Sequence, residues 1–351
     1  MLDRLAPEQY DTLPDIPEPA ENPDLVGHDA IADELAHDYA AGKLHHGLLF
    51  AGPRGIGKAT LAFRLANHLL AHPRAENAPA RMERPASESS IFRMVASGAH
   101  PGVLHLTRPF DDKRKVFRTG ITVDEIRRLS RFLSMSSHDG GWRIVIVDPA
   151  DDMNRQAANA LLKSLEEPPR RTLFVLVSHQ PGRLLPTIRS RCRIVRFHPL
   201  SGEELRNVLS LAGNGLEADG HHVVERAGGS AREALLLTMY GGLDILQAIE
   251  EIMSAKRFDA GKAYRLAEAV TGRDKAVQFS IFNDQVLSIL SGAARTASRQ
   301  GAPVLAAELA RHWSEALEKM RIADGYNLDG KEHVVGLVHD AYLALQGTAR
   351  R

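Results

Sequence analysis

The sequence is poor in cysteine and has no excess of charge of either sign. Cys192 is the single cysteine among 351 residues, so an internal disulfide and a cage of several thiolates around a metal are both excluded. The 44 lysines and arginines balance 44 aspartates and glutamates. A protein that binds nucleic acid through an overall positive charge is therefore excluded, and only local basic patches remain to be weighed.

Long apolar runs are also missing. No stretch approaches the roughly 18 to 20 apolar residues that a membrane-spanning helix needs, and the N-terminal residues show no secretory pattern. We therefore expect a cytoplasmic protein. The chain is longer than one hydrophobic core usually requires, so more than one domain is expected.

The N-terminal residues 1–24 contain several prolines with acidic residues between them, which predicts an extended, weakly packed arm. Helical spacing begins at residue 29, where Ile31, Leu35 and Tyr39 recur every four positions. Residues 71–101 are rich in alanine, proline, arginine and glutamate, a composition that predicts an excursion on the surface.

Short apolar runs separated by helical patterns dominate the first 200 residues. Five of them are predicted to be strands: residues 47–51, 103–106, 143–148, 172–178 and 193–197. Strands that alternate with helices predict parallel crossovers and a doubly wound α/β domain. The last run alternates in polarity, which predicts an edge strand. From Ser201 onward the pattern is helical only.

The segment Gly52–Thr60 lies between the first predicted strand and a helical pattern. Glycine-rich loops in this context bind phosphate, because backbone N–H groups can crowd an anion and the lysine reaches the outer phosphates. The residues expected to do so are Gly52, Gly55, Gly57 and Lys58. A glycine-rich turn that arose by coincidence is the alternative.

Two positions depart from a hydrolytic site. The residue after Lys58 is Ala59, where a serine or threonine would bind magnesium, and Thr60 lies about 100° further around the helix. Asp148 ends the third predicted strand in the position of an acid beside magnesium, although it could instead cap the next turn. Pro149 follows it, where a glutamate would activate water. We expect ATP and magnesium to bind weakly here.

Two segments carry clustered arginines. Residues 182–193 contain four arginines and no acidic residue, which predicts an anionic partner. Seven basic residues lie between Lys113 and Arg131. Arg127 and Arg131 belong to a helical pattern with an apolar face, so they either form a solvated surface or contact a phosphate backbone.

Five colinear blocks resemble the clamp-loader branch of the AAA+ ATPases. They are Gly52–Thr60, Asp148, the Leu-Glu-Glu-Pro-Pro block within 158–169, the Ser-Arg-Cys block within 185–192, and Gly229–Arg232. The resemblance covers about residues 26–243, and the Leu-Glu-Glu-Pro-Pro and Ser-Arg-Cys blocks are highly specific to clamp loaders. The C-terminal helical patterns match only in character.

The resemblance implies an α/β plus all-α architecture in four parts. An N-terminal arm (1–24) precedes a RecA-like AAA+ domain with a doubly wound parallel sheet (25–199), a small helical lid (200–242) and a helical collar that joins subunits (243–351). The implied complex is the bacterial DNA polymerase III clamp loader, a five-subunit ring. Its implied partners are gamma/tau motor subunits and a delta subunit, and through the complex the sliding clamp and primed DNA.

The resemblance also implies roles for single residues. Arg191 resembles the arginine finger that acts in trans on the ATP of a neighbouring subunit. Ser178 resembles sensor 1 and Arg232 the sensor-2 arginine. The implied degenerate nucleotide site comprises Gly52, Gly55, Gly57, Lys58, Thr60, Asp148, Ser178 and Arg232. The implied DNA contacts are Arg127, Arg131 and Thr187.

Related subunits often carry a four-cysteine zinc module after the phosphate-binding loop. Residues 71–101 contain no cysteine, so zinc is not expected, and no residue is assigned as a metal ligand. The chain is expected not to hydrolyse ATP alone and to act as a non-hydrolysing component of the polymerase holoenzyme. A self-sufficient AAA+ motor acting on DNA would need the missing acid and hydroxyl. A P-loop kinase would leave the Ser-Arg-Cys block without a role.

Overall fold

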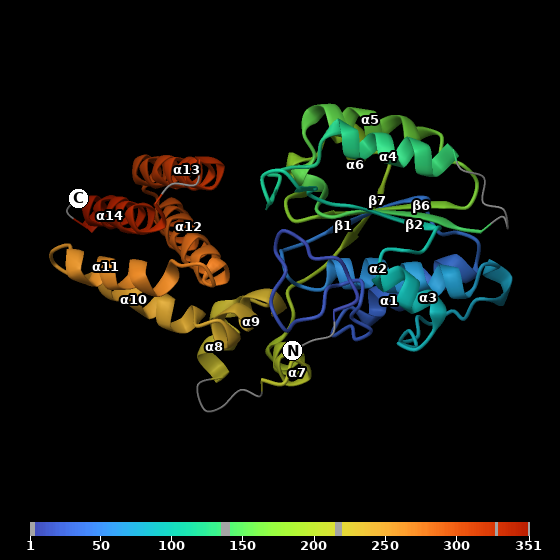
Figure 1. The fold of residues 1–351 in the computed structure, drawn as a ribbon, viewed down its shortest axis with the longest axis horizontal. Helices are drawn as coiled ribbons and strands as arrows, with labels where there is room; N and C mark the ends of the chain where they lie inside the picture. Colours follow the sequence, from blue (N-terminus) through green and yellow to red (C-terminus); the bar gives the residue numbers. More distant parts are fainter. Residues whose placement is uncertain (1–3, 135–140, 215–219, 327–328, 350–351) are drawn as a thin grey trace. The chain divides into compact units, whose positions relative to one another are not determined.

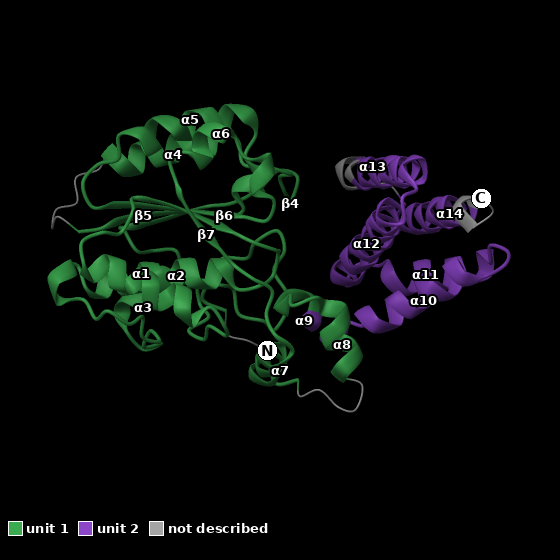
Figure 2. Ribbon diagram, turned by 180° about the vertical axis from the view of Figure 1, so that it is seen from behind, with its two compact units in different colours: residues 1–233 green, residues 234–351 purple. Residues whose placement is uncertain are grey.

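The computed structural model describes residues 4–134, 141–214, 220–326 and 329–349. The chain divides into two compact units, Met1–Glu233 and Ala234–Arg351 (Figure 2). Each unit has its own hydrophobic core, since Phe50 is fully buried in the first unit and Phe282 in the second.

The first unit is built on a five-stranded parallel sheet (Figure 1). Its strands are β1 (Gly47–Ala51), β2 (Val103–Leu106), β5 (Arg143–Val147), β6 (Thr172–Ser178) and β7 (Arg193–Arg196). They lie in the order β2-β5-β6-β1-β7. The predicted doubly wound sheet is confirmed, with β7 at an edge as its alternating polarity indicated.

Helices cover both faces of this sheet (Figure 1). One face carries α1 (Asp29–Ala40), α2 (Lys58–Ala71) and α3 (Ser90–Ala96), and the other α4 (Val123–Ser134), α5 (Arg155–Glu166) and α6 (Pro186–Arg189). Successive residues of a strand point to opposite faces. Leu48 and Phe50 therefore join the core under α1 and α2, whereas Leu49 joins the core under α4 and α5.

Several short elements connect these layers. They are η1 (Ala75–Asn77), η2 (Ala150–Asp152), η3 (Pro181–Arg183) and the antiparallel hairpin of β3 (Phe110–Asp111) and β4 (Val116–Phe117). The hairpin was not predicted, because two residues per strand are too few to show a period of two.

Helices alone follow the sheet in the described residues. They are α7 (Gly202–Leu211), α8 (Gly220–Ala227), α9 (Ala231–Met239), α10 (Gly242–Ser254), α11 (Ala260–Val270), α12 (Ala276–Arg299), α13 (Pro303–Tyr326) and α14 (Gly330–Ala349). In the second unit, Ile249, Phe282 and Val334 are fully buried. The all-helical C-terminal region is confirmed, and its division into lid and collar stays a prediction.

The expectation that the N-terminal residues are weakly packed was wrong. In the predicted arm, residues 1–3 lie outside the described residues, but Ala6 and Leu13 are buried and Arg4 pairs with Glu18. Most residues of the predicted surface excursion are exposed or half-buried, and within it α3 buries Phe92. Proline-rich and charged chain packs here through specific polar contacts and a few apolar anchors, which average composition does not reveal. None of the described helices is both long and apolar enough to cross a membrane.

Candidate functional site

The strand, the glycine-rich loop and the helix follow one another as the sequence predicted. The loop begins after β1, and α2 begins at Lys58. Gly55 and Gly57 have φ angles of +74° and +96°, in the left-handed region that favours glycine. A Cβ on Gly52 would lie 2.7 Å from the carbonyl oxygen of Phe197, so close packing also requires glycine there.

Lys58 turns its amine toward its own loop. The buried Nζ donates hydrogen bonds to the carbonyl oxygens of Gly52 (2.8 Å) and Pro53. Desolvation lowers the pKa of this amine to about 8, although Asp148 and Asp151 oppose the shift. The lysine is therefore satisfied by backbone carbonyls, the groups that compete with phosphate oxygens for its protons.

The acidic groups of the site lie at the carboxyl ends of β5 and β6. Desolvation raises the pKa of Asp148 to about 7, and the carboxylate of Asp11 adds to the rise. Ser178 donates to Oδ1 of Asp151 (2.7 Å), and the backbone N–H of His179 donates to Oδ2 of the same side chain. The sequence did not single out Asp151, because three positions separate it from the strand end and no motif marks it.

The segment that contains Arg232 packs directly on the phosphate-binding loop. The backbone N–H of Arg232 donates to the carbonyl oxygen of Gly55 (3.1 Å). A Cβ on Gly55 would lie 2.5 Å from both the Cβ of Arg232 and the Oγ of Ser230. The structure thus brings Arg232 to the loop that contains Gly55 and Lys58, although the two segments lie far apart in sequence.

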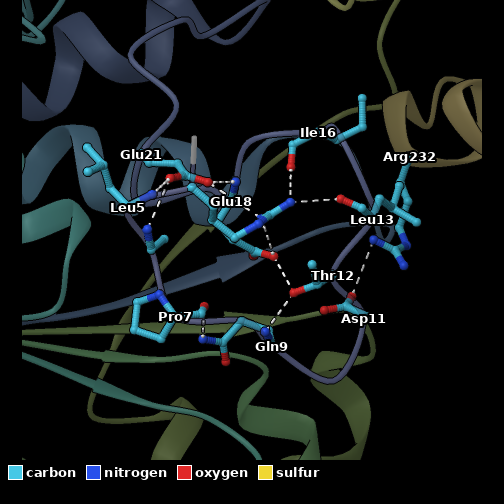
Figure 3. Close-up of polar contacts among 12 residues, drawn as sticks. Leu5, Pro7, Gln9, Asp11, Thr12, Leu13, Ile16, Glu18, Glu21 and Arg232 are labelled. Atoms are coloured by element: carbon cyan, nitrogen blue, oxygen red, sulfur yellow. Dashed lines mark hydrogen bonds and ion pairs between the residues drawn. The ribbon is translucent and has the colours of Figure 1, made fainter. Parts of the chain in front are cut away.

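Asp11 enters this site from the N-terminal segment. Its Oδ2 lies 2.8 Å from Nη2 of Arg54 and 3.7 Å from Nη1 of Arg232 (Figure 3 shows the second pair). Burial would raise the pKa of Asp11, but the guanidinium groups of Arg232 and Arg54 outweigh that effect and lower it. Neither Asp11 nor Arg54 was predicted to belong to the site.

These residues do not fit a magnesium-bound nucleotide. The side chain of Ala59 has no oxygen to bind the metal, and the half-buried Thr60 is one position further along α2. The amine of Lys58 is held by carbonyl oxygens, and two arginines beside the loop already face a carboxylate. The arrangement can hold an anion, and here that anion is the carboxylate of Asp11.

The arginine-rich segment after β6 meets acids of its own chain. Nη2 of Arg191 lies 2.6 Å from Oε1 of Glu166 at the end of α5, and its Nη1 donates to the carbonyl oxygen of Thr187 (3.0 Å). Arg193 pairs with Glu34 and Asp38 of α1. The predicted anionic partner is therefore supplied in part by other elements of the same chain.

The residues predicted to contact DNA are exposed on α4 and α6. Ile126 anchors α4 in the core, while Arg127 and Arg131 lie on its outer side. Arg127 Nη1 lies 2.6 Å from Oδ1 of Asp124, and both side chains are largely exposed. Thr187 is exposed on α6, on the same face of the sheet as α4 (Figure 1).

Comparison with known proteins identifies the family of the first unit. Residues 27–201 match the family described as DNA polymerase III, delta subunit. Over these residues, the chain belongs to that family. The resemblance to DNA polymerase III subunits that the sequence blocks indicated is confirmed.

Individual relatives carry matching names. DNA polymerase III subunit delta' of Pseudomonas aeruginosa is 42% identical over 162 residues, which are 45% of this chain and 44% of that protein. The delta' subunit of Escherichia coli K12 is 33% identical over 48% of this chain and 46% of its own length. A gamma subunit of Buchnera aphidicola is 28% identical over 61% of this chain and 56% of its own length. The chain thus spans about half the length of these relatives.

Proposed function

We propose that this chain is the delta-prime subunit of a DNA polymerase III clamp loader and helps to place the sliding clamp on primed DNA. The observation that carries the proposal is the match of residues 27–201 to the DNA polymerase III delta-subunit family. The proposed partners are gamma/tau motor subunits and a delta subunit in a five-subunit ring. The subunits named delta' and gamma among its relatives support this membership.

The proposed contribution of the chain to ATP hydrolysis is Arg191 rather than its own loop. The Arg191 side chain is about one-third exposed and pairs with Glu166, which is itself half exposed. An ion pair this exposed contributes little, roughly 0 to 1 kcal/mol, so Arg191 can exchange Glu166 for a phosphate at low cost. A guanidinium supplied by a neighbour stabilises the charge that develops on a γ-phosphate during transfer.

A self-sufficient AAA+ motor is the second candidate function. It would require a hydroxyl to bind magnesium and an acid to activate water, and Ala59 and Pro149 provide neither. The inward hydrogen bonds of Lys58 also disfavour it.

The deciding experiment measures both the assembly of the complex and ATP hydrolysis by the isolated chain. The purified chain is mixed with gamma/tau and delta subunits, and the products are weighed by native mass spectrometry. We expect one defined complex that contains this chain, and we expect the chain alone to show no magnesium-dependent ATP hydrolysis. Failure to enter any complex would contradict clamp-loader membership. Turnover by the isolated chain that disappears in Lys58→Ala would favour the motor instead.

A further inference from the structure

The carboxylate of Asp11 lies beside the phosphate-binding loop. One carboxylate oxygen faces two guanidinium groups, Arg54 from the loop and Arg232 from the start of α9. Guanidinium groups recognise carboxylate and phosphate through the same fork of N–H donors. A carboxylate in this position therefore competes directly with the phosphates of a nucleotide.

The N-terminal segment is folded so that it holds Asp11 in place (Figure 3). Arg4 donates to the carbonyl oxygens of Leu13 (3.0 Å) and Ile16 (2.9 Å), and so closes the chain into a loop around Asp11. Glu21 closes the base of this loop by accepting from the backbone N–H groups of Leu5 (2.7 Å) and Ala6 (3.0 Å).

Polar and aromatic contacts fix the tip of the same loop. The Oγ1 of Thr12 accepts from the backbone N–H of Gln9 (2.6 Å) and donates to Glu18. The guanidinium of Arg108 lies 3.9 Å from the centre of the Tyr10 ring, and its Nε lies 2.6 Å from Oδ2 of Asp152. Contacts therefore hold this loop at its base, at its tip and against Arg108, so the loop is a folded part of the site.

The lysine of the phosphate-binding loop also has partners within the chain. Lys58 is satisfied by the carbonyl oxygens of Gly52 and Pro53. A triphosphate placed beside Arg54 and Arg232 would meet the charge of Asp11 directly, and juxtaposed like charges oppose binding strongly. Binding would thus require the N-terminal segment to leave.

We propose that residues 4–21 form a built-in occupant of the phosphate site, in which Asp11 excludes nucleotide by holding Arg54 and Arg232. The occupant gives a reason to expect weak nucleotide binding that is separate from the missing metal ligand at Ala59. It concerns the isolated chain alone, so it stands or fails independently of clamp-loader membership.

The test measures ATP binding without magnesium, because Ala59 supplies no metal ligand. Isothermal titration calorimetry at fixed ionic strength compares the full-length chain with Asp11→Asn, which keeps the shape of the side chain and removes its charge. We expect Asp11→Asn to bind ATP at least about tenfold more tightly, since a like charge leaves the site. The matched control is Glu8→Gln, which removes one charge from an exposed position of the same segment and should bind ATP as the parent does.

Three outcomes would overturn the proposal. Equal ATP affinity of Asp11→Asn and the parent chain would show that Asp11 does not exclude nucleotide. An equal gain in Glu8→Gln would show a general effect of charge. A gain that persists in Asp11→Asn combined with Lys58→Ala would place the ATP outside the phosphate-binding loop.

A second measurement needs no substitution in the parent chain. ATP at about 100 times the dissociation constant of Asp11→Asn should speed hydrogen exchange at the amides of Leu5 and Ala6, because displacement removes their bonds to Glu21. Unchanged exchange at these amides would contradict displacement of the segment. If Asp11→Asn does not fold, Tyr10→Ala replaces it: this variant loosens the segment by removing the ring that packs on Arg108, and it should bind ATP more tightly than the parent chain.

Discussion

At the scale of single residues, the arginines after β6 differ in how tightly the chain holds them. Arg193 contacts two acids of α1, Glu34 and Asp38. Arg191 contacts one partly exposed acid, Glu166, and one backbone carbonyl. The first arginine is fixed within the domain, whereas the second is held by contacts that an external phosphate can replace.

Substitution of Arg191 should therefore reduce catalysis in the assembled ring and leave assembly intact. Removal of an arginine finger costs roughly 10³ to 10⁵ in rate at a single site, and turnover at other sites will make the overall loss smaller. We expect Arg191→Ala and Arg191→Lys both to lower DNA-stimulated ATPase, because lysine keeps the charge and loses the fork. The control is Arg183→Ala, an exposed arginine of the same segment. Full ATPase activity in either Arg191 variant would exclude the finger.

The site residues that could be predicted from the sequence are those that belong to a short local motif. Gly55, Lys58 and Ala59 are readable because the loop pattern is local. Asp11 was missed because its partner Arg54 lies 43 positions away, and no spacing rule links them. Glu166 was read as part of a motif, and only the fold shows that it meets Arg191.

At the scale of elements, the sheet was predictable and the irregular chain was not. Strands buried on both faces are continuous apolar runs, as β5 and β6 are. The β3–β4 hairpin is too short for periodicity, and α3 lies in a segment whose composition suggested surface chain. Residues 4–24 fold through ion pairs and backbone hydrogen bonds, which leave no periodic pattern.

The arginines of α4 are predicted to contact DNA. Arg127 pairs with Asp124 one turn earlier, and because both side chains are largely exposed, this pair competes poorly with a phosphate backbone. In the assembled complex, Arg127→Ala combined with Arg131→Ala should shallow the salt dependence of binding to primed DNA by about 0.9 for each phosphate that is no longer neutralised. Fluorescence anisotropy over a salt series measures the slope. Lys262→Ala, which removes a partly exposed lysine of α11 that pairs with Glu251, serves as the control. An unchanged slope in the double variant would make these arginines a solvated surface.

At the scale of the whole molecule, the second unit combines a helical core with exposed apolar side chains. Leu317, Ile322 and Leu343 are 37%, 42% and 53% exposed on α13 and α14. Exposed apolar side chains of this size can contribute to interfaces with other proteins. The unit is therefore the proposed oligomerisation element of the chain.

Leu343→Asp should weaken entry into the ring while leaving the chain folded. A charge placed in an apolar interface must lose its water without gaining a partner, and we expect a cost on the order of 2 kcal/mol, or about 30-fold in affinity. The matched control is Leu211→Asp, which makes the same change at a leucine 58% exposed on α7 of the first unit. Native mass spectrometry of the reconstituted complex measures incorporation, and thermal unfolding shows that both variants remain folded.

A shortened chain that ends at Glu233 lacks the second unit altogether and should not enter the complex. Undiminished incorporation of that shortened chain would place the subunit interface in the first unit, because the surface that remains would then suffice for assembly.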